Sequence, residues 1–418
     1  MSRRKFNLII LMIAAGWILT RFWMVSQLGY FHTGISVSYE DVNIFHAWAK
    51  SITSSGSLPT DDAWQYPPGA AFLFLIPWLN SSHYMVSFMM LMLIIDLVAT
   101  IAIAFRSLKE AHFTGIAVYL ILMPALGSKP LLRFDLAPTA VMVIALAVAW
   151  NGTRPRLFGI LAGVGFYLKV WPIIILLATP TRRFMGKTIG IFLSFSVVIL
   201  GLAFSLWGNP LGSFLTAQKS RGLELEAVGA SPWYLRQAVF GIAVPHGLRY
   251  GSNEVISGTA DVVAKILRFL MILITVYFAL WWYSRTQDKK LDPALGRDAV
   301  LVGILCYLVV SPVLSPQYMI WLVGIISVIT CGKYTVVGRP LLLSGAAVLL
   351  TQALLQNWGG LVSNGASSAY ILVARNLVLL AAAVDGLHCI GIPNFRTLKP
   401  PSLVLFRRSI HAKNTYSR

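Results

Sequence analysis

The chain has 418 residues, of which 57% are hydrophobic and only 12% are charged. Soluble proteins have about 25% charged residues, so this chain has too few polar side chains to cover a soluble core of its size. The formal charge of +19 lies in short basic clusters between apolar runs. That pattern is typical of cytoplasmic loops rather than of a nucleic-acid-binding face, and the composition predicts an integral membrane protein.

Eight apolar runs are clear candidates for membrane-crossing helices, since about 20 apolar residues cross a bilayer. The first follows a basic N-terminus without a small-residue cleavage site, so we interpret it as an uncleaved helix rather than a signal peptide. Several runs are shorter than the bilayer requires, which predicts tilted, broken or protected spans. The eight runs cover residues 7–28, 83–105, 188–207, 261–284, 298–313, 316–332, 340–356 and 369–388.

Three further apolar regions are less regular. Residues 113–126 and 136–150 predict two spans joined by an outer turn. Residues 157–180 have basic clusters at both ends, and a short hairpin turning at residues 169–172, where a proline breaks the helix, keeps both clusters on one side. Residues 68–80 are too short to cross, and we expect them at the outer interface.

Most basic residues then lie on one face, which supports about twelve crossings with both termini in the cytoplasm. The predicted fold class is all-α, a polytopic membrane protein in which some crossings are short or broken. Residues 1–395 form a single transmembrane domain, and residues 396–418 form a basic cytoplasmic tail. Two long segments remain outside, 30–82 and 208–260, and long loops in a compact protein are usually functional.

The first outer loop contains a predicted amphipathic helix, because apolar residues at 42, 45, 48, 49 and 52 follow a helical stripe. Asp41 at its start has two compatible interpretations. It fits a helix-capping pattern, and its carboxylate could accept a proton from a substrate hydroxyl. Tyr66 precedes a Pro-Pro-Gly bend and suits the interface.

Charged residues near the outer ends of spans are further candidates. Arg133 and Asp135 are two residues apart, so they do not face each other on a helix, and each is expected to meet another partner. They either lock helices together or, in the case of Arg133, grip a phosphate. Lys169 at the hairpin turn has a lipid phosphate or a helix-end carbonyl as its expected partner. Asp96 lies inside an apolar span, and we interpret it as a helix-packing residue rather than a catalytic one.

The second outer loop holds Arg221 and Glu224, whose spacing permits a local pair, followed by His246. These charges could bind an anionic head group or form a solvated face. Gln317 and Tyr318, at a tight outer turn, offer hydrogen bonds to a sugar, although the turn alone would explain the Ser-Pro before them. The sequence has no Walker loop, GxSxG or HExxH pattern, so any phosphate would be bound by arginine and lysine.

Taken in order, these motifs resemble those of the bacterial polyprenyl-phosphate-mannose-dependent alpha-mannosyltransferases, which belong to the GT-C superfamily of membrane glycosyltransferases. The resemblance spans roughly residues 7–388. It rests on the acidic first outer loop and on the motifs Tyr66–Gly69, Arg133–Asp135, Leu168–Pro172, Arg221–Glu224 and Ser315–Tyr318.

The resemblance implies a mechanism in which an acceptor hydroxyl displaces a polyprenyl phosphate from the anomeric carbon of a sugar, with inversion. Asp41 matches the family's catalytic aspartate as general base, and neighbouring Glu40 is the alternative carboxylate. The resemblance implies no metal or other cofactor. The candidates for binding the donor phosphate are Arg133, Lys169 and Arg221, and the expected substrate contacts are Glu40, Tyr66, Asp135, Glu224, His246, Gln317 and Tyr318.

The predicted function is therefore transfer of a hexose, with mannose resting on the resemblance, to a cell-envelope glycolipid or glycan at the outer face of the cell membrane. The expected partners are the donor, the acceptor and the bilayer, with no nucleic acid. The alternatives are a transporter or flippase for envelope precursors and a non-catalytic subunit for envelope assembly. A midplane cavity between related halves would favour the transporter, whereas an outer cavity lined by Asp41 would favour the transferase.

Overall fold

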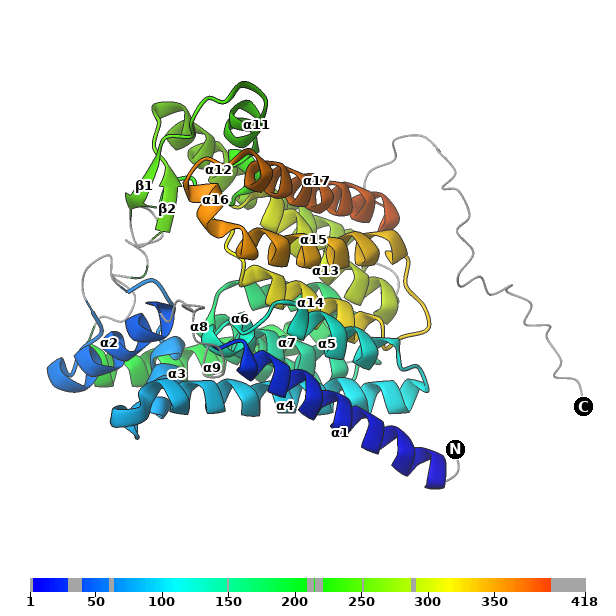
Figure 1. Ribbon diagram of the computed structural model, residues 1–418. Helices are drawn as coiled ribbons and strands as arrows, with labels where there is room; N and C mark the ends of the chain where they lie inside the picture. Colours follow the sequence, from blue (N-terminus) through cyan, green and yellow to red (C-terminus); the bar gives the residue numbers. More distant parts are fainter. Residues whose placement is uncertain are drawn as a thin grey trace, which may run out of the picture.

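The computed structural model describes residues 3–28, 40–59, 64–148, 150–208, 214, 221–249, 252–286 and 291–391. The predicted cytoplasmic tail, parts of both outer loops and the Glu40 side chain lie outside the described residues. The long helices form one bundle (Figure 1). The start of α1 and the end of α17 lie at one end of this bundle, and the short elements α2, α3, β1 and β2 lie at the other.

Seven helices of the described chain are long and apolar enough to cross a membrane. They are α1 (Arg3–Ser26), α4 (Tyr84–Glu110, after the η1 turn Ser81–His83), α9 (Arg182–Trp207), α12 (Gly258–Arg285), α13 (Pro293–Val310), α15 (Gly338–Gln356) and α17 (Ala366–Cys389). Shorter apolar helices are α3 (Gly69–Trp78), α5 (Thr114–Ala125), α7 (Leu136–Val148), α8 (Pro155–Leu168) and α14 (Tyr318–Ile329). Each of the eight predicted runs contains a helix, whereas the number of crossings remains a prediction.

The remaining elements are mostly short and flank the bundle. They are α2 (Glu40–Ser55), α6 (Lys129–Leu132), η2 (Trp171–Ala178), η3 (Val228–Ala230), α11 (Ser231–Phe240), β1 (His246–Arg249), β2 (Ser252–Val255) and α16 (Trp358–Val362). The two strands pair antiparallel, with His246 opposite Val255. The described chain is mostly helical, in line with the all-α prediction. The short hairpin in the second outer loop was not predicted, because helical periodicity in the spans carries no information on it.

Burial separates the central helices from those that face lipid. Every residue of α14 is buried, as expected for a helix that is apolar on all sides. By contrast, α9 exposes many large apolar side chains, such as Val197 at 72% and Phe204 at 66%. In water such a surface would be costly, so α9 is a lipid-facing helix.

The chain reverses between α8 and α9, as the predicted hairpin requires. Helix α8 ends at Leu168, and η2 begins two residues after Lys169. A Cβ atom built on Gly165 would lie 2.8 Å from Pro172, and one on Gly152 would lie 2.6 Å from Pro180. Because residues at both ends of the first arm meet residues of the second arm in reverse order, the second arm runs back along the first. The hairpin prediction is confirmed.

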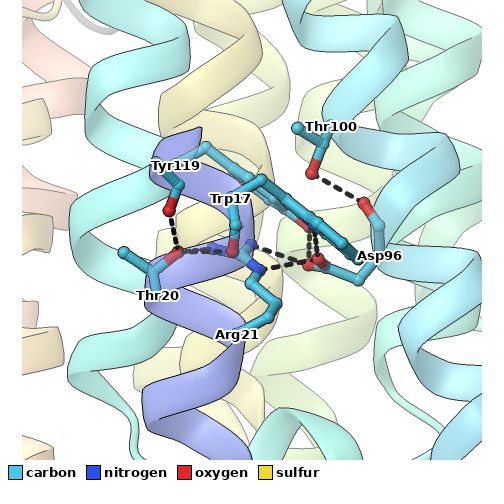
Figure 2. Close-up of polar contacts among 7 residues, drawn as sticks. Trp17, Thr20, Arg21, Asp96, Thr100 and Tyr119 are labelled. Atoms are coloured by element: carbon cyan, nitrogen blue, oxygen red, sulfur yellow. Dashed lines mark hydrogen bonds and ion pairs between the residues drawn. The ribbon is translucent and has the colours of Figure 1, made fainter. Parts of the chain in front are cut away.

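Helix α1 is fastened to the bundle by a buried polar network (Figure 2). The Arg21 guanidinium donates to both carboxylate oxygens of Asp96, at 2.7 and 2.8 Å. The Tyr119 hydroxyl and the Trp17 indole N–H donate to the same carboxylate at 2.8 and 2.6 Å. Both oxygens are therefore satisfied, which a buried charge requires, and the interpretation of Asp96 as a helix-packing residue is confirmed.

Candidate active site

A cavity of about 990 Å³ lies at the end of the bundle that carries α2 and β2. Both long outer segments contribute to its wall, together with the starts or ends of several spans. Among the residues that line it are Asp41, Tyr66, Arg133, Lys169, Trp171, Arg221, Glu224, Glu226, Gln317, Tyr318 and Trp321. Most of the predicted site residues are thus brought to one place.

Asp41 is held at the cavity wall by the packing of α2. The helix buries its apolar stripe, and the Phe45 ring stacks on Phe74 of α3 with centroids 4.5 Å apart. Phe45 also meets the edge of Phe134, at 5.8 Å. This contact places the first turn of α2 beside Arg133, whose guanidinium forms an ion pair with the Asp41 carboxylate.

Arg133 and Asp135 point to different partners, as predicted. Arg133 has an extended backbone just after α6, whereas the buried Asp135 accepts a hydrogen bond of 2.6 Å from the Lys169 ammonium. The Trp321 indole N–H donates to the same oxygen at 2.7 Å. Lys169 is therefore already bonded to a carboxylate in this structure.

The Lys169 ammonium is surrounded by aromatic rings. It lies 5.0 to 5.6 Å from the ring centroids of four side chains, Tyr66, Phe134, Tyr318 and Trp321. Cation–π attraction of this kind contributes about 0.5–2 kcal/mol per favourable contact. Together with the hydrogen bond to Asp135, this attraction offsets part of the cost of desolvating the ammonium.

The rings of Trp171, Trp321 and Tyr318 form a continuous stack along the cavity. The Trp171 and Trp321 rings lie 4.5 Å apart at 18°, and the Tyr318 and Trp321 rings lie 4.0 Å apart at 20°. The Trp171 indole nitrogen is buried and has no partner among the described residues. The stack offers a flat apolar surface with a buried, unpaired N–H at its edge.

Glu224 is fixed to the turn before α14. Its backbone N–H donates to the Pro312 carbonyl at 2.9 Å, and its carboxylate accepts from the Ser315 hydroxyl at 2.8 Å. The second carboxylate oxygen has no partner among the described residues. No ion pair between Arg221 and Glu224 occurs in the described part of the chain, so the local pairing that their spacing allows is not formed.

Sequence reasoning missed a second buried ion pair at this cavity. The Arg375 guanidinium of α17 donates to the Glu226 carboxylate at 2.7 Å, and both side chains are almost fully buried. An arginine inside an apolar span is a functional or packing signal in itself, and Arg375 could have been found in this way. Burial raises the pKa of Glu226 to about 7, against the opposing attraction of Arg375.

Burial also shifts the pKa values of Tyr66 and Glu254 near the cavity. Burial raises the pKa of the Tyr66 hydroxyl, and the nearby carboxylates of Asp135 and Asp41 raise it further. Tyr66 therefore stays protonated and can donate a hydrogen bond. Burial also raises the pKa of Glu254, whose carboxylate accepts from the Gly222 backbone N–H at 2.8 Å.

The structure does not bring every predicted residue to the cavity. His246 lies on β1, where its Nδ1 is 2.9 Å from the Val244 carbonyl, and it is not among the described residues that line the cavity. The Glu40 side chain lies outside the described residues. Within the described ranges, no three His, Cys, Asp or Glu side chains gather where they could hold a metal ion.

The described chain is thus a bundle of apolar helices with a charged and aromatic cavity at one end. The family model for glycosyltransferase family 87 matches residues 64–312. This is more than half of the chain, so the protein belongs to glycosyltransferase family 87. It is accordingly a glycosyltransferase. A search of curated proteins finds no relative that matches.

Proposed function

We propose that this glycosyltransferase moves a hexose, most simply mannose, from a polyprenyl-phosphate donor to a glycolipid or glycan acceptor at the outer face of the membrane. The observation that carries the proposal is the ion pair of Asp41 and Arg133 on the wall of the 990 Å³ cavity. A base and a phosphate-binding cation are side by side there. The donor and acceptor classes follow the resemblance of the sequence motifs.

The chemistry is a single displacement with inversion. Asp41 accepts the proton of the acceptor hydroxyl while the oxygen of that hydroxyl bonds to the anomeric carbon. The bond from that carbon to the phosphate oxygen breaks, and the phosphate leaves with the electron pair. A phosphate leaving group has a low pKa and therefore needs stabilisation of its charge more than a proton. Arg133 and Arg221 on the cavity wall supply that stabilisation.

Because Arg133 is paired with Asp41, binding of the donor phosphate also affects the Asp41 carboxylate. In this structure Arg133 is bonded to Asp41, and its Nε has no partner among the described residues. A phosphate that binds the guanidinium bidentately competes with the aspartate for it. Donor binding therefore frees the carboxylate for the acceptor hydroxyl and couples the state of the base to the presence of the donor.

The other predicted residues take supporting roles. Lys169 donates one of its three N–H groups to Asp135, and its positive charge attracts the phosphate. Tyr66, Gln317 and Tyr318 offer hydrogen bonds to sugar hydroxyls from the cavity wall. The unpartnered oxygen of Glu224 is an acceptor for a hydroxyl group.

The position of the cavity favours a transferase over a transporter. Transporter sites lie near the midplane between related halves, whereas this cavity includes residues of α2 and the second outer loop at one end of the bundle. The family match adds an independent reason.

The direct test is transfer from radiolabelled polyprenyl-phosphate mannose in membranes that contain the full chain. Asp41→Asn and Asp41→Ala are expected to lose transfer by about 100-fold or more, the usual contribution of a general base. Asp261→Asn is the matched control, since Asp261 is exposed on α12 and does not line the cavity. Full transfer in both Asp41 variants would remove Asp41 as the base, and Glu40→Gln would then be the next variant to measure.

A further inference from the structure

A second concave surface lies between α8 and α9, away from the cavity described above. It has a volume of about 580 Å³ and is lined by Arg154, Arg156 and Lys187 together with Pro155, Leu157, Gly190 and Ile191. We name this surface the basic groove. Three of its seven lining residues are cations, and none is acidic.

The basic groove exists because small residues let the two helices approach closely. A Cβ atom on Gly159 would lie 2.7 Å from the Thr188 carbonyl, and one on Gly163 would lie 2.5 Å from the Phe195 ring. The helices run parallel here, since the start of α8 meets the second turn of α9 through a hydrogen bond from Thr188 to the Pro155 carbonyl at 3.4 Å. The basic start of α8 is thereby placed next to Lys187.

The three cations have no compensating charge in the part of the chain that the structure describes. Within the described ranges no ion pair joins Arg154, Arg156 or Lys187 to a carboxylate, and all three are exposed. The fold holds like charges together at the mouth of one concavity, which costs free energy unless an anion binds there.

The groove continues into a lipid-facing apolar surface. Beyond its basic rim, Ile160 of α8 is 42% exposed and Leu193 of α9 is 55% exposed. The same end of the bundle holds the end of α17, because Arg182 donates to the Tyr283 carbonyl and Arg285 donates to the Gly391 carbonyl. Basic side chains over an apolar helix surface match a molecule with an anionic head and hydrocarbon tails.

From this charge complementarity we propose that the basic groove binds the head group of an anionic glycerophospholipid, with its acyl chains along α8 and α9. The phosphate lies among Arg154, Arg156 and Lys187, and the chains cover the exposed apolar residues. Basic pockets between membrane helices bind anionic lipid head groups by this combination. The basic groove shares no lining residue with the cavity of the candidate active site, so this proposal is tested independently of the proposed function.

The test is lipid binding to the purified full chain in nanodiscs, with phosphatidylglycerol competing against phosphatidylcholine, read by native mass spectrometry. Wild type is expected to retain phosphatidylglycerol selectively. Arg156→Gln with Lys187→Gln is expected to weaken it roughly 30-fold, because each basic residue near anionic lipid contributes about fivefold. Arg183→Gln with Lys333→Gln removes the same charge from exposed positions outside the groove and is expected to bind as wild type does.

A second variant tests the groove without touching its charge. A Cβ on Gly190 meets nothing within 4 Å, so Gly190→Trp fits the fold and fills the groove, and it is expected to reduce phosphatidylglycerol binding. An equal loss of phosphatidylglycerol binding in the control variant with Arg183→Gln and Lys333→Gln would show that general surface charge binds the lipid. Displacement of the lipid by millimolar inorganic phosphate would show a small-anion site. Either result, or equal retention of the two lipids by wild type, overturns the proposal.

Discussion

Three buried carboxylates in this protein are each matched with a cation. Asp96, Asp135 and Glu226 are each at most 2% exposed, and each accepts a hydrogen bond from an arginine or a lysine. Asp41 differs, because it lies at a cavity wall and its ion pair with Arg133 keeps 20–25% of both side chains exposed. A partly exposed pair can be opened by a ligand at lower cost than a fully buried one, which is why the proposed catalytic role rests on this pair.

The first prediction concerns Arg133. Replacing it with methionine removes a charged hydrogen-bond donor from the donor phosphate, and a bond of that kind contributes about 1.5–3 kcal/mol. We expect kcat/KM for the donor to fall about 10- to 100-fold, with Arg133→Lys intermediate because the lysine keeps the charge but loses the bidentate geometry. Transfer rates against donor concentration measure this. Arg249→Met, an exposed position on β1, is the control, and unchanged kinetics in Arg133→Met would contradict the phosphate-binding role.

At the scale of elements, the helices are held together by two kinds of contact. Glycines allow close approach, as between α8 and α9, where a Cβ on Gly159 would meet backbone and side-chain atoms. Polar networks fasten helices that bury little apolar surface, as in α1, where only Arg21 and Met24 are buried. Both devices suit a membrane, in which lipid tails solvate apolar surfaces as well as protein does.

The second prediction is a double-mutant cycle on α1. Asp96→Leu or Arg21→Met alone leaves a buried charge unpaired and is expected to destabilise the protein by about 3–5 kcal/mol. The double variant is expected to be more stable than either single one, because no unpaired charge remains. Thermal unfolding in detergent gives the stabilities of the wild type, the two single variants and the double variant. Additive losses would show that the pair does not act as a unit.

The third prediction compares two glycines. Gly159→Leu forces a side chain against the Thr188 carbonyl and Ile191, so we expect a loss of about 1–3 kcal/mol from overpacking. A Cβ on Gly201 of α9 meets nothing within 4 Å, and Gly201→Leu is expected to leave stability unchanged or raise it. Thermal unfolding midpoints of the two variants and of the wild type test this. A midpoint for Gly159→Leu equal to that of the wild type would show that α8 and α9 do not pack this closely.

At the scale of the whole molecule, the two ends of the bundle carry different structural features. The cavity, α2, α3 and the β-hairpin lie at one end. The start of α1, the end of α17 and the basic groove lie at the other. In the topology that the basic residues favour, the first end faces outward and the second faces the cytoplasm.

The fourth prediction tests that orientation. In a Cys389→Ser background the other two cysteines are buried, and single cysteines at Ser54, Arg249, Arg183 or Lys333 are all at exposed positions. A membrane-impermeant maleimide added to intact cells is expected to label Ser54→Cys and Arg249→Cys. Arg183→Cys and Lys333→Cys are expected to react only after permeabilisation. The reverse pattern would place the cavity on the cytoplasmic side.

The helices and the class of protein follow from the amino-acid sequence without knowledge of the packing. Apolar run length and helical period are local properties, so the sequence predicts a helix in all eight runs, the amphipathic helix at Asp41 and the break after Leu168. The ordered motifs indicate a membrane glycosyltransferase. The β-hairpin was missed, because the helical pattern of the spans carries no signal for it.

Which charges meet depends on the tertiary structure. Asp41 and Arg133 lie on different elements, as do Glu226 and Arg375, and the partner of a charge depends on how those elements pack rather than on its neighbours in sequence. Spacing allowed Arg221 to pair with Glu224, yet the turn before α14 holds Glu224 by its backbone and through Ser315. Most residues that line the candidate site were therefore predicted from the chain, but the ion pair of Asp41 and Arg133 follows from the packing of α2 against α3 and the segment after α6.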